Sequence, residues 1–211
     1  MKNTMKTRLI PLFLLAAALL LPAFASAQEA TPSKLVLENS QRILSTLEQR
    51  RPEFKKNRGA LEQFIASEFD ATFDRDYAAR QVLGRHARGA SAGDVSLFAD
   101  ALADNLMRRY GSSLLDFNQK LKVRIKSETT LPRGLGVKVS SELLREAGEP
   151  IPVDYLMRKS GSTWKVFDVM VEGVSFVQSF RRQFDNELSQ KSIRQVASEL
   201  ASGKVTANAD R

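Results

Sequence analysis

The sequence predicts an α+β fold, in which a mainly antiparallel four-stranded sheet is packed with several helices. Two changes of periodicity carry this prediction. Apolar residues recur every three or four positions up to about residue 110, alternate with polar residues between residues 121 and 171, and return to helical spacing after residue 173. The 211 residues are 43% apolar and 27% charged, a composition typical of one folded domain.

Six helices are expected, four before the strands and two after them. Pro32 follows Thr31 at the start of the first helix and Pro52 stops it, because proline suits the first turn of a helix and breaks its interior. Asp70 is expected to cap the turn that leads to the third helix, and Ser91 to cap the fourth, which is the longest. The expected helices span residues 32–50, 59–69, 74–83, 91–111, 174–188 and 192–200.

Four strands with short turns between them predict an antiparallel meander. Leu121, Val123 and Ile125 alternate with basic residues, as expected for a half-buried strand with a basic outer face. The last strand is apolar on both faces and is therefore expected to be central, and Gly161 marks the hairpin before it. The expected strands span residues 121–126, 137–143, 153–157 and 164–171.

The N-terminus has the three parts of a secretory signal peptide. Three basic residues and no acidic one lie in the first eight positions, Leu9–Leu21 is apolar except for Pro11, and Ala25-Ser26-Ala27 is a small-x-small cleavage site. The apolar run is shorter than the roughly 20 residues that span a bilayer. We expect a signal peptide at residues 1–27, a single domain at residues 28–201, a disordered tail at residues 202–211, and a location in the periplasm. Cleavage removes three basic residues and lowers the net charge from +8 to +5.

Most catalytic and metal chemistry is excluded by composition. Cysteine is absent, so a disulfide or a thiolate metal site cannot form, and the single histidine, His86, leaves almost nothing for zinc binding or Ser-His catalysis. His86 lies in an arginine-rich turn and is expected to be exposed. Asp168 lies on an apolar strand, where its carboxylate needs a backbone or arginine donor, and Glu172 would lie roughly 13 Å from it, too far for a glycosidase pair. No catalytic residue, metal ligand or cofactor is therefore expected.

The basic strand face raises the question of nucleic acid. Lys122, Arg124, Lys126 and Lys138 are expected on one side of the sheet, but no aromatic residues are interleaved with them, and a secreted chain does not meet nucleic acid. We expect a solvated face, with acidic partner proteins or anionic head groups as the alternative contacts.

Several helices carry apolar surface that must be covered. It lies on the stripe at residues 95–110, on the cluster of Phe64, Phe69 and Phe73, and on the helix at residues 174–184. These residues form either a filled core or the wall of an apolar cavity. Periodicity does not separate the two.

The segment that joins the last strand to the helix after it has a distinctive sequence. The run WKVFDVMVEGVSFV at Trp164–Val177, followed by Phe180-Arg181 and Gln183-Phe184, closely resembles the signature of the MlaC family, also called the toluene-tolerance auxiliary proteins. Asp76–Gly84 and the helix Phe98–Tyr110 are also similar to that family. The resemblance implies a twisted sheet of the NTF2-like type, packed with helices around an acyl-chain cavity, so that residues 28–201 form one lipid-binding domain.

The resemblance also implies a function. It implies a periplasmic phospholipid carrier that maintains outer-membrane lipid asymmetry by shuttling lipid between an outer-membrane MlaA-porin complex and an inner-membrane MlaFEDB-type ABC transporter complex. Such a carrier requires no cofactor and no nucleic acid, and a monomer is expected. A periplasmic chaperone-like module that binds apolar protein segments is the alternative, and a hydrolase that uses Asp168 is a remote third.

The cavity is expected to be lined by the fourth helix, one face of the sheet and the segment after it. These residues are Phe98, Leu102, Leu106, Val123, Ile125, Val139, Tyr155, Met157, Phe167, Val169, Val171, Val174 and Val177.

Overall fold

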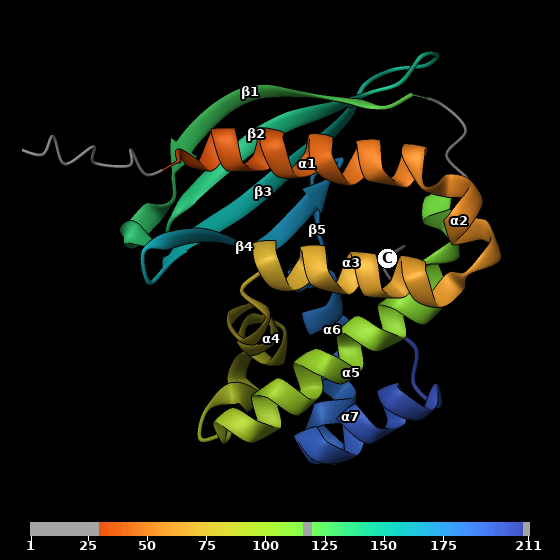
Figure 1. The fold of residues 1–211 in the computed structure, drawn as a ribbon. Helices are drawn as coiled ribbons and strands as arrows, with labels where there is room; N and C mark the ends of the chain where they lie inside the picture. Colours follow the sequence, from red (N-terminus) through yellow and green to blue (C-terminus); the bar gives the residue numbers. More distant parts are fainter. Residues whose placement is uncertain (1–29, 116–119, 209–211) are drawn as a thin grey trace, which may run out of the picture.

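The computed structural model describes residues 30–115 and 120–208, so the predicted signal peptide and the last three residues of the predicted tail lie outside the described residues. Five helices precede five strands, and two helices follow them (Figure 1). No helix in these two ranges is long and apolar enough to cross a bilayer. The elements are α1 (Pro32–Gln49), α2 (Arg51–Lys56), α3 (Arg58–Thr72), α4 (Arg75–Leu83), η1 (Gly84–Ala87), α5 (Ala92–Tyr110), η2 (Ser112–Leu115), β1 (Lys122–Thr130), η3 (Pro132–Gly134), β2 (Val137–Leu144), β3 (Ile151–Ser160), β4 (Thr163–Val171), β5 (Val174–Ser175), α6 (Phe176–Gln190) and α7 (Ile193–Ser202).

The sheet is an antiparallel meander in the order β1-β2-β3-β4-β5, as predicted, but it has five strands instead of four. The fifth strand forms because Glu172 and Gly173 make a two-residue turn with φ values of 50° and 82°. Such positive values at both positions suit a tight hairpin. Val174 and Ser175 therefore pair with β4, and α6 begins at Phe176 instead of at Val174 as predicted.

The strand predicted to be central, β4, lies beside the short β5 near one edge of the sheet. It is nevertheless buried on both faces at Val166–Asp168, because α3, α4 and α6 all contact it. The pairing with β3 shifts at this point, so that Phe167 is the extra residue of a bulge. The Phe167 ring meets the ring of Tyr77 on α4 nearly edge-on, with centroids 5.2 Å apart.

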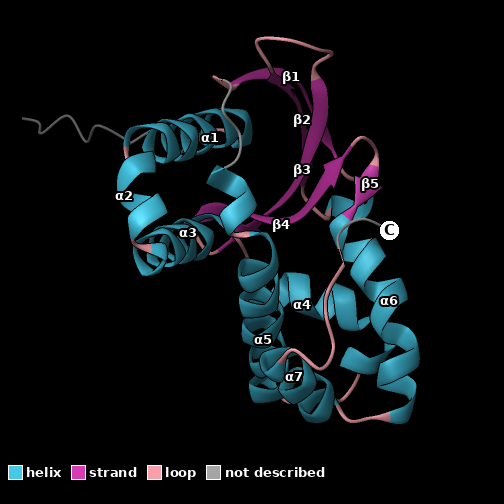
Figure 2. Ribbon diagram, turned by 90° about the vertical axis from the view of Figure 1, so that its right-hand side faces the viewer, coloured by secondary structure: helices cyan, strands magenta, loops and turns pink. Residues whose placement is uncertain are grey.

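The helices form two groups around the sheet. Figure 2 shows α1, α2 and α3 on one side of the sheet, and α4 to α7 packed together below β4. Helix α1 contacts β1 and β2, and its Val36 is buried against Val137, Val139, Met157 and Val166. The sheet therefore has a covered face, which turns towards α1.

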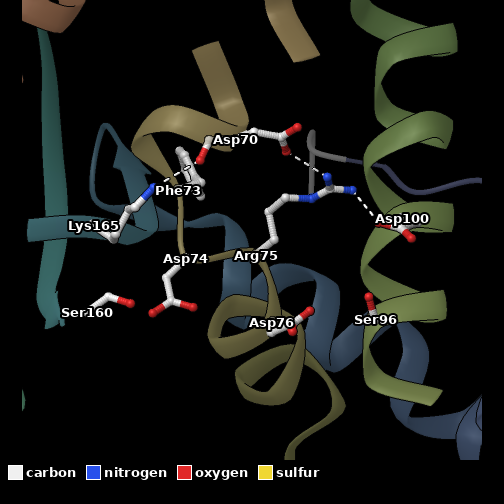
Figure 3. A pocket seen from close by; sticks show the side chains of 9 residues that line it. All are labelled: Asp70, Phe73, Asp74, Arg75, Asp76, Ser96, Asp100, Ser160 and Lys165. Atoms are coloured by element: carbon white, nitrogen blue, oxygen red, sulfur yellow. Dashed lines mark hydrogen bonds and ion pairs between the residues drawn. The ribbon is translucent and has the colours of Figure 1, made fainter. Parts of the chain in front are cut away.

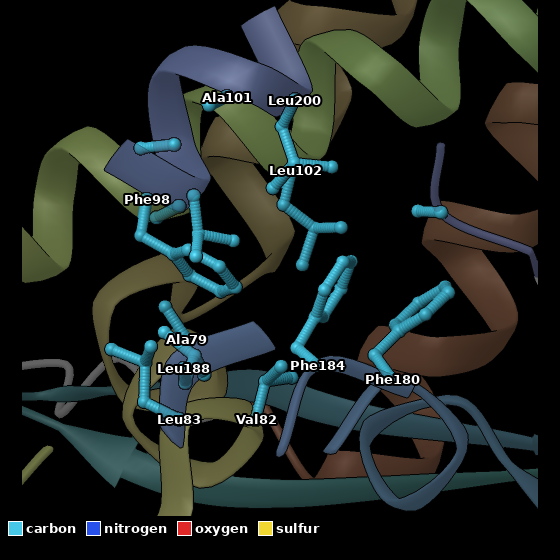
Figure 4. Close-up of a cluster of buried hydrophobic side chains, with 14 of the residues drawn as sticks. Ala79, Val82, Leu83, Phe98, Ala101, Leu102, Phe180, Phe184, Leu188 and Leu200 are labelled. Carbon is cyan, nitrogen blue, oxygen red and sulfur yellow. The ribbon is translucent and has the colours of Figure 1, made fainter. Parts of the chain in front are cut away.

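The second group of helices has its own apolar core (Figure 4). Phe98 of α5 and Phe184 of α6 are fully buried, and their rings meet edge-on with centroids 5.7 Å apart. Leu83 of α4 and Leu200 of α7 are equally buried in the same cluster. This core fixes α4, α5, α6 and α7 to one another.

Two helix starts differ from the prediction. Pro52 ends α1 as predicted, but it also lies in the first turn of an additional short helix, α2, because proline is tolerated there. Asp74, not Asp70, caps α4, since its Oδ1 accepts the Tyr77 N–H at 3.2 Å. Asp70 instead forms an ion pair with Arg75. As predicted, α5 is the longest helix of the described residues, and Ser91 caps it.

The tail predicted to be disordered from Ser202 is held against the helices as far as residue 208. The buried Asn105 of α5 explains this difference: its Oδ1 accepts the Ala207 N–H at 2.9 Å, and its Nδ2 donates to the Val205 carbonyl at 3.0 Å. Ala207 is fully buried. A buried amide needs such partners, and the tail supplies them.

Candidate functional site

An apolar pocket of about 120 Å³ lies where α3, α4, α5 and α6 meet β4. Alanines create the space, because Ala99 and Ala103 lie one helical turn apart on α5 and face Ala78 and Ala79 of α4 across the pocket. Arg75 and Asp168 are its two charged residues. The pocket is lined by Phe69, Phe73, Arg75, Ala78, Ala79, Val82, Ala99, Leu102, Ala103, Leu106, Phe167, Asp168, Val169, Phe176, Val177 and Phe180.

A larger pocket of about 870 Å³ lies between the second half of α1 and the start of β1. This volume falls within the range of about 300–1,000 Å³ that is usual for ligand pockets, whereas the apolar pocket is smaller. Its floor is apolar, and charged residues stand around it. It is lined by Gln41, Leu44, Ser45, Leu47, Glu48, Arg51, Leu114, Lys120, Leu121, Lys122, Val123, Leu143 and Glu146.

Both pockets adjoin the covered face of the sheet. Val123 pairs with Leu143 at the larger pocket, while Val139 pairs with Tyr155 and Tyr155 with Val169 at the apolar pocket. Directly paired residues share a face. The two pockets are separated by three strand spacings and four residues along a strand, which corresponds to about 20 Å across the sheet.

Half-buried side chains lie on this face between the pockets. Ile125 and Tyr155 pack against the buried cluster that includes Val36. Burial raises the pKa of the Tyr155 hydroxyl, and a hydrogen bond with Ser40 of α1 partly opposes this shift. The phenol is therefore neutral at physiological pH and attaches α1 to the sheet.

A third pocket, of about 280 Å³, is polar and shares Phe73 and Arg75 with the apolar pocket (Figure 3). Arg75 connects three helices, because its guanidinium on α4 pairs with Asp70 of α3 at 2.7 Å and with Asp100 of α5 at 2.5 Å. The Lys165 ammonium donates to the Asp70 carbonyl at 2.9 Å. Arg75 therefore closes the apolar pocket on its polar side.

Asp168 has a structural position at the other side of the apolar pocket. Its carboxylate accepts from the Ser175 hydroxyl at 2.5 Å and from the Val177 N–H at 3.0 Å, so it holds the N-terminus of α6 against β4. Burial raises the pKa of the Asp168 carboxyl, and these hydrogen bonds partly oppose the shift. The predicted backbone donor is thus present.

Six of the residues predicted to line a cavity lie at these pockets. Five of them line the apolar pocket: Leu102, Leu106, Phe167, Val169 and Val177. The sixth, Val123, lines the larger pocket. The apolar pocket thus brings together residues from α5, β4 and α6 that are far apart in the sequence.

The other predicted residues line neither of these pockets. Val139 and Met157 are buried in the cluster between the sheet and α1, and Ile125 and Tyr155 pack against that cluster. The remaining three differ in burial: Phe98 is fully buried in the helical core, Val171 is half-buried, and Val174 is 44% exposed. Val174 is exposed because it lies in β5, beyond the hairpin turn.

Part of the wall of the apolar pocket was not among the predicted lining residues. The sequence indicates Phe69 and Phe73 only as apolar surface that needs cover, yet both line this pocket, and so does Phe180. The available signal is the pair Ala99 and Ala103, small residues one turn apart within an otherwise large apolar stripe.

His86 is half-buried instead of exposed, because its Nε2 lies 3.0 Å from Asp185 Oδ1 on α6. Within residues 30–115 and 120–208, no group of three His, Asp or Glu side chains is arranged to hold a metal ion.

The outer face of the sheet is less basic than the sequence indicates, since each of three basic residues has an acidic partner on a neighbouring strand. Arg124 and Lys126 of β1 pair with Glu142 of β2, and Lys138 of β2 pairs with Asp154 of β3.

Comparisons with known proteins agree with this fold. Residues 37–202 match the family described as MlaC protein. The toluene tolerance protein ttg2D of Pseudomonas putida is 27% identical over 206 residues, which are 93% of this chain and 92% of that protein. The intermembrane phospholipid transport system binding protein MlaC of Haemophilus influenzae is 21% identical over 168 residues, 78% of each chain.

A solved structure has the same fold. It is a phospholipid-binding protein from Ralstonia solanacearum in complex with a phospholipid, with a TM-score of 0.72 and 21% identity, covering 82% of this chain and 98% of that chain. Because the family match extends over most of the sequence, from α1 to the end of α7, this chain belongs to the MlaC protein family.

Proposed function

We propose that this chain is a phospholipid carrier that holds acyl chains along the covered face of the sheet. The observation that carries the proposal is the arrangement of the larger pocket and the apolar pocket at opposite corners of that face, about 20 Å apart. The hydrocarbon core of a bilayer is about 30 Å thick, so one acyl chain extends over about half of that length. A single chain, at about 15 Å, therefore covers most of the distance between the two pockets.

Uptake requires that the wall of the site moves. The apolar pocket alone is too small for a diacyl lipid, and Ile125 and Tyr155 fill the space between the pockets. Separation of α1 from the sheet would join both pockets into one apolar space. The protein from Ralstonia solanacearum that shares this fold was solved in complex with a phospholipid, which supports a phospholipid as the ligand.

The energetics favour an enclosed site. A diacyl lipid has on the order of 30 methylene groups, and at about 0.8 kcal/mol each their exposure to water costs roughly 24 kcal/mol. An apolar interior replaces the bilayer interior, so lipid transfer becomes an exchange between similar environments. The polar head group stays outside this apolar interior.

We assign the carrier to the periplasm, between an outer-membrane MlaA-porin complex and an inner-membrane MlaFEDB-type transporter complex, where it would maintain lipid asymmetry. Membership of the MlaC family and the predicted signal peptide at residues 1–27 support this assignment. The direction of transfer would come from partners that change the lipid affinity at each end.

Native mass spectrometry tests the proposal. The full chain, expressed with its own N-terminal segment and purified without detergent or added lipid, should carry mass increments equal to whole phospholipids, and extraction should release them intact. The same protein, unfolded and refolded without lipid, provides the baseline. Protein without adducts, or with bound peptides instead of lipids, would refute the carrier, and the second outcome would favour the chaperone-like module. Release of cleaved lipid would indicate a hydrolase.

A further inference from the structure

The larger pocket combines an apolar floor with a basic rim. Leu44 and Leu47 of α1 face Val123 and Leu143 of the sheet across the floor. Three cationic residues, Arg51, Lys120 and Lys122, line the same pocket together with two acidic ones, Glu48 and Glu146. Lys122 alternates with Val123 on the edge strand β1, so it lies at the rim of the pocket and not on its floor. An apolar floor below a charged rim matches the two halves of an amphiphile.

The lysines of this rim differ from those elsewhere on the sheet. Lys126 pairs with Glu142 and Lys138 pairs with Asp154, at 3.3 and 3.6 Å. Lys120 and Lys122 are exposed, and among residues 30–115 and 120–208 neither forms an ion pair. Among the described residues, no carboxylate neutralises their charge.

The neighbouring helix α2 adds to the positive field. Arg51 lies at its start and is held in place by the Leu115 carbonyl, which accepts its Nη1–H at 2.6 Å. Lys55 and Lys56 follow on the same short helix and are exposed. The three cationic lining residues outnumber Glu48 and Glu146, so the pocket has a net positive charge that attracts anions over about 10 Å at 0.1 M salt.

We propose that the rim formed by Arg51, Lys120 and Lys122 binds the head-group phosphate of a phospholipid and selects lipids with a net negative charge. The proposal rests on the lipid-carrier function and extends it to the choice of lipid. A phosphatidylglycerol head group presents its phosphate without a compensating cation. A phosphatidylethanolamine head group carries an ammonium that the basic rim repels, so it binds less well.

The test measures lipid choice with identical acyl chains. The full chain is incubated with vesicles of equal parts dioleoyl-phosphatidylglycerol and dioleoyl-phosphatidylethanolamine, separated from them, and analysed for bound lipid. Two exposed charge pairs should favour phosphatidylglycerol by about three- to tenfold. The double variant Lys120→Gln and Lys122→Gln should take up the two lipids in nearly equal amounts. The matched control, Lys126→Gln with Lys138→Gln, removes the same charge elsewhere and should keep the preference.

The outcomes separate this proposal from the carrier function. Lipid uptake without a preference in the unmodified chain, a preference that survives in the double variant, or a preference lost in the control would overturn the head-group site and leave the carrier intact. Absence of lipid from the unmodified chain would overturn the carrier itself. A further arm offers glycerol phosphate without acyl chains, and its retention would assign the rim to free anions instead of to lipid.

Discussion

Replacement of Val169 by phenylalanine is expected to fill part of the apolar pocket and exclude an acyl chain from it. Val169 is half-buried and lines the pocket, and phenylalanine adds four carbon atoms. The added ring atoms take up part of the pocket, which measures about 120 Å³. The end of an acyl chain that entered at this corner of the sheet would therefore clash with the ring.

The effect on affinity follows from the lost burial. Four methylene-sized groups contribute about 0.8 kcal/mol each, or about 3 kcal/mol in total, to the binding of an acyl chain in the pocket. A loss of this size lowers the affinity about a hundredfold. The new ring gains a similar burial, and strain offsets about 1–3 kcal/mol of it. The free energy of unfolding should therefore stay within about 2 kcal/mol of the unmodified protein.

Two further valine-to-phenylalanine variants serve as controls. Val174 is exposed on β5, so Val174→Phe should leave lipid binding unchanged. Val139 is fully buried and lines none of the three pockets described above, so Val139→Phe should cost about 1–3 kcal/mol of stability by overpacking. Because Val139 belongs to the covered face along which the acyl chain is proposed to lie, this variant is a positive control, and its lipid affinity should fall as well.

Urea unfolding gives the stability of each variant, and the transfer of labelled lipid from vesicles gives its affinity. A Val169→Phe variant that unfolds cooperatively and still binds lipid as tightly as the unmodified protein would show that acyl chains do not occupy the apolar pocket. Equal losses in Val169→Phe and Val174→Phe would show that bulk alone, and not the pocket, is responsible.

Three other substitutions and one exchange measurement test the attachments of the helices. Arg75→Met keeps the apolar stem but removes the ion pairs that connect α3 and α5, so labelled lipid should exchange about two- to threefold faster, a small effect because both partner carboxylates are exposed; an unchanged rate would show that Arg75 does not restrain opening. Burial raises the pKa of the Asp168 carboxyl, so its ionisation destabilises the folded state as pH rises from the ordinary value through the raised one. Asp168→Asn should remove that decline in urea-unfolding free energy, and an identical pH profile would count against it. Asn105→Ala leaves buried hydrogen-bond partners unsatisfied and should lower the free energy of unfolding by about 3 kcal/mol. A loss below about 1 kcal/mol in urea unfolding would contradict this role of Asn105. Backbone amides of α1 should exchange with deuterium faster than those of α6, and the reverse order by mass spectrometry would place the opening elsewhere.

The order of the main elements could be predicted because each has its own period and its own stop signals. The Ser91 cap and the stripe that follows it define α5, and Gly161 marks the turn between β3 and β4. The strand β5 could not be predicted, because Val174 also fits the helical spacing that continues to Val177. Its formation depends on Glu172, a residue type that seldom adopts a positive φ.

The pocket could be predicted only in part, for a physical reason. Alternation assigns Val169 to a face of the sheet, and helical spacing assigns Leu102 to a stripe, but neither pattern tells which stripes meet. Phe73 reaches the apolar pocket because its segment forms a bridge to Val166 of β4, a contact between distant parts of the chain. The space itself comes from alanines such as Ala99, which a search for large apolar residues passes over.

The contacts that hold α6 and α1 in place indicate which of these two helices moves away from the sheet more easily. Helix α6 is fixed at its start by buried hydrogen bonds to Asp168, and Phe184 anchors it in the helical core. Helix α1 buries only Pro32, Val36 and Leu47. Its hydrogen bond from Ser33 to Glu128, at 2.6 Å, is exposed, which leaves the bond between Ser40 and Tyr155 as its inner attachment to the sheet. Local opening costs only the contacts that it breaks, so α1 separates from the sheet more often than α6 does.

An opening at α1 has a consequence for transfer. The side chains that close the empty protein, such as Val36 against Val139, belong to the same face that an acyl chain would contact. Closure and lipid binding therefore compete, and the empty carrier hides its apolar face from water by packing α1 onto it. A partner that binds the open form more tightly than the closed form shifts this balance without an energy source in the carrier, since a ligand moves an equilibrium only by its difference in affinity for the two states. Loading and release then depend on what each membrane complex does to α1.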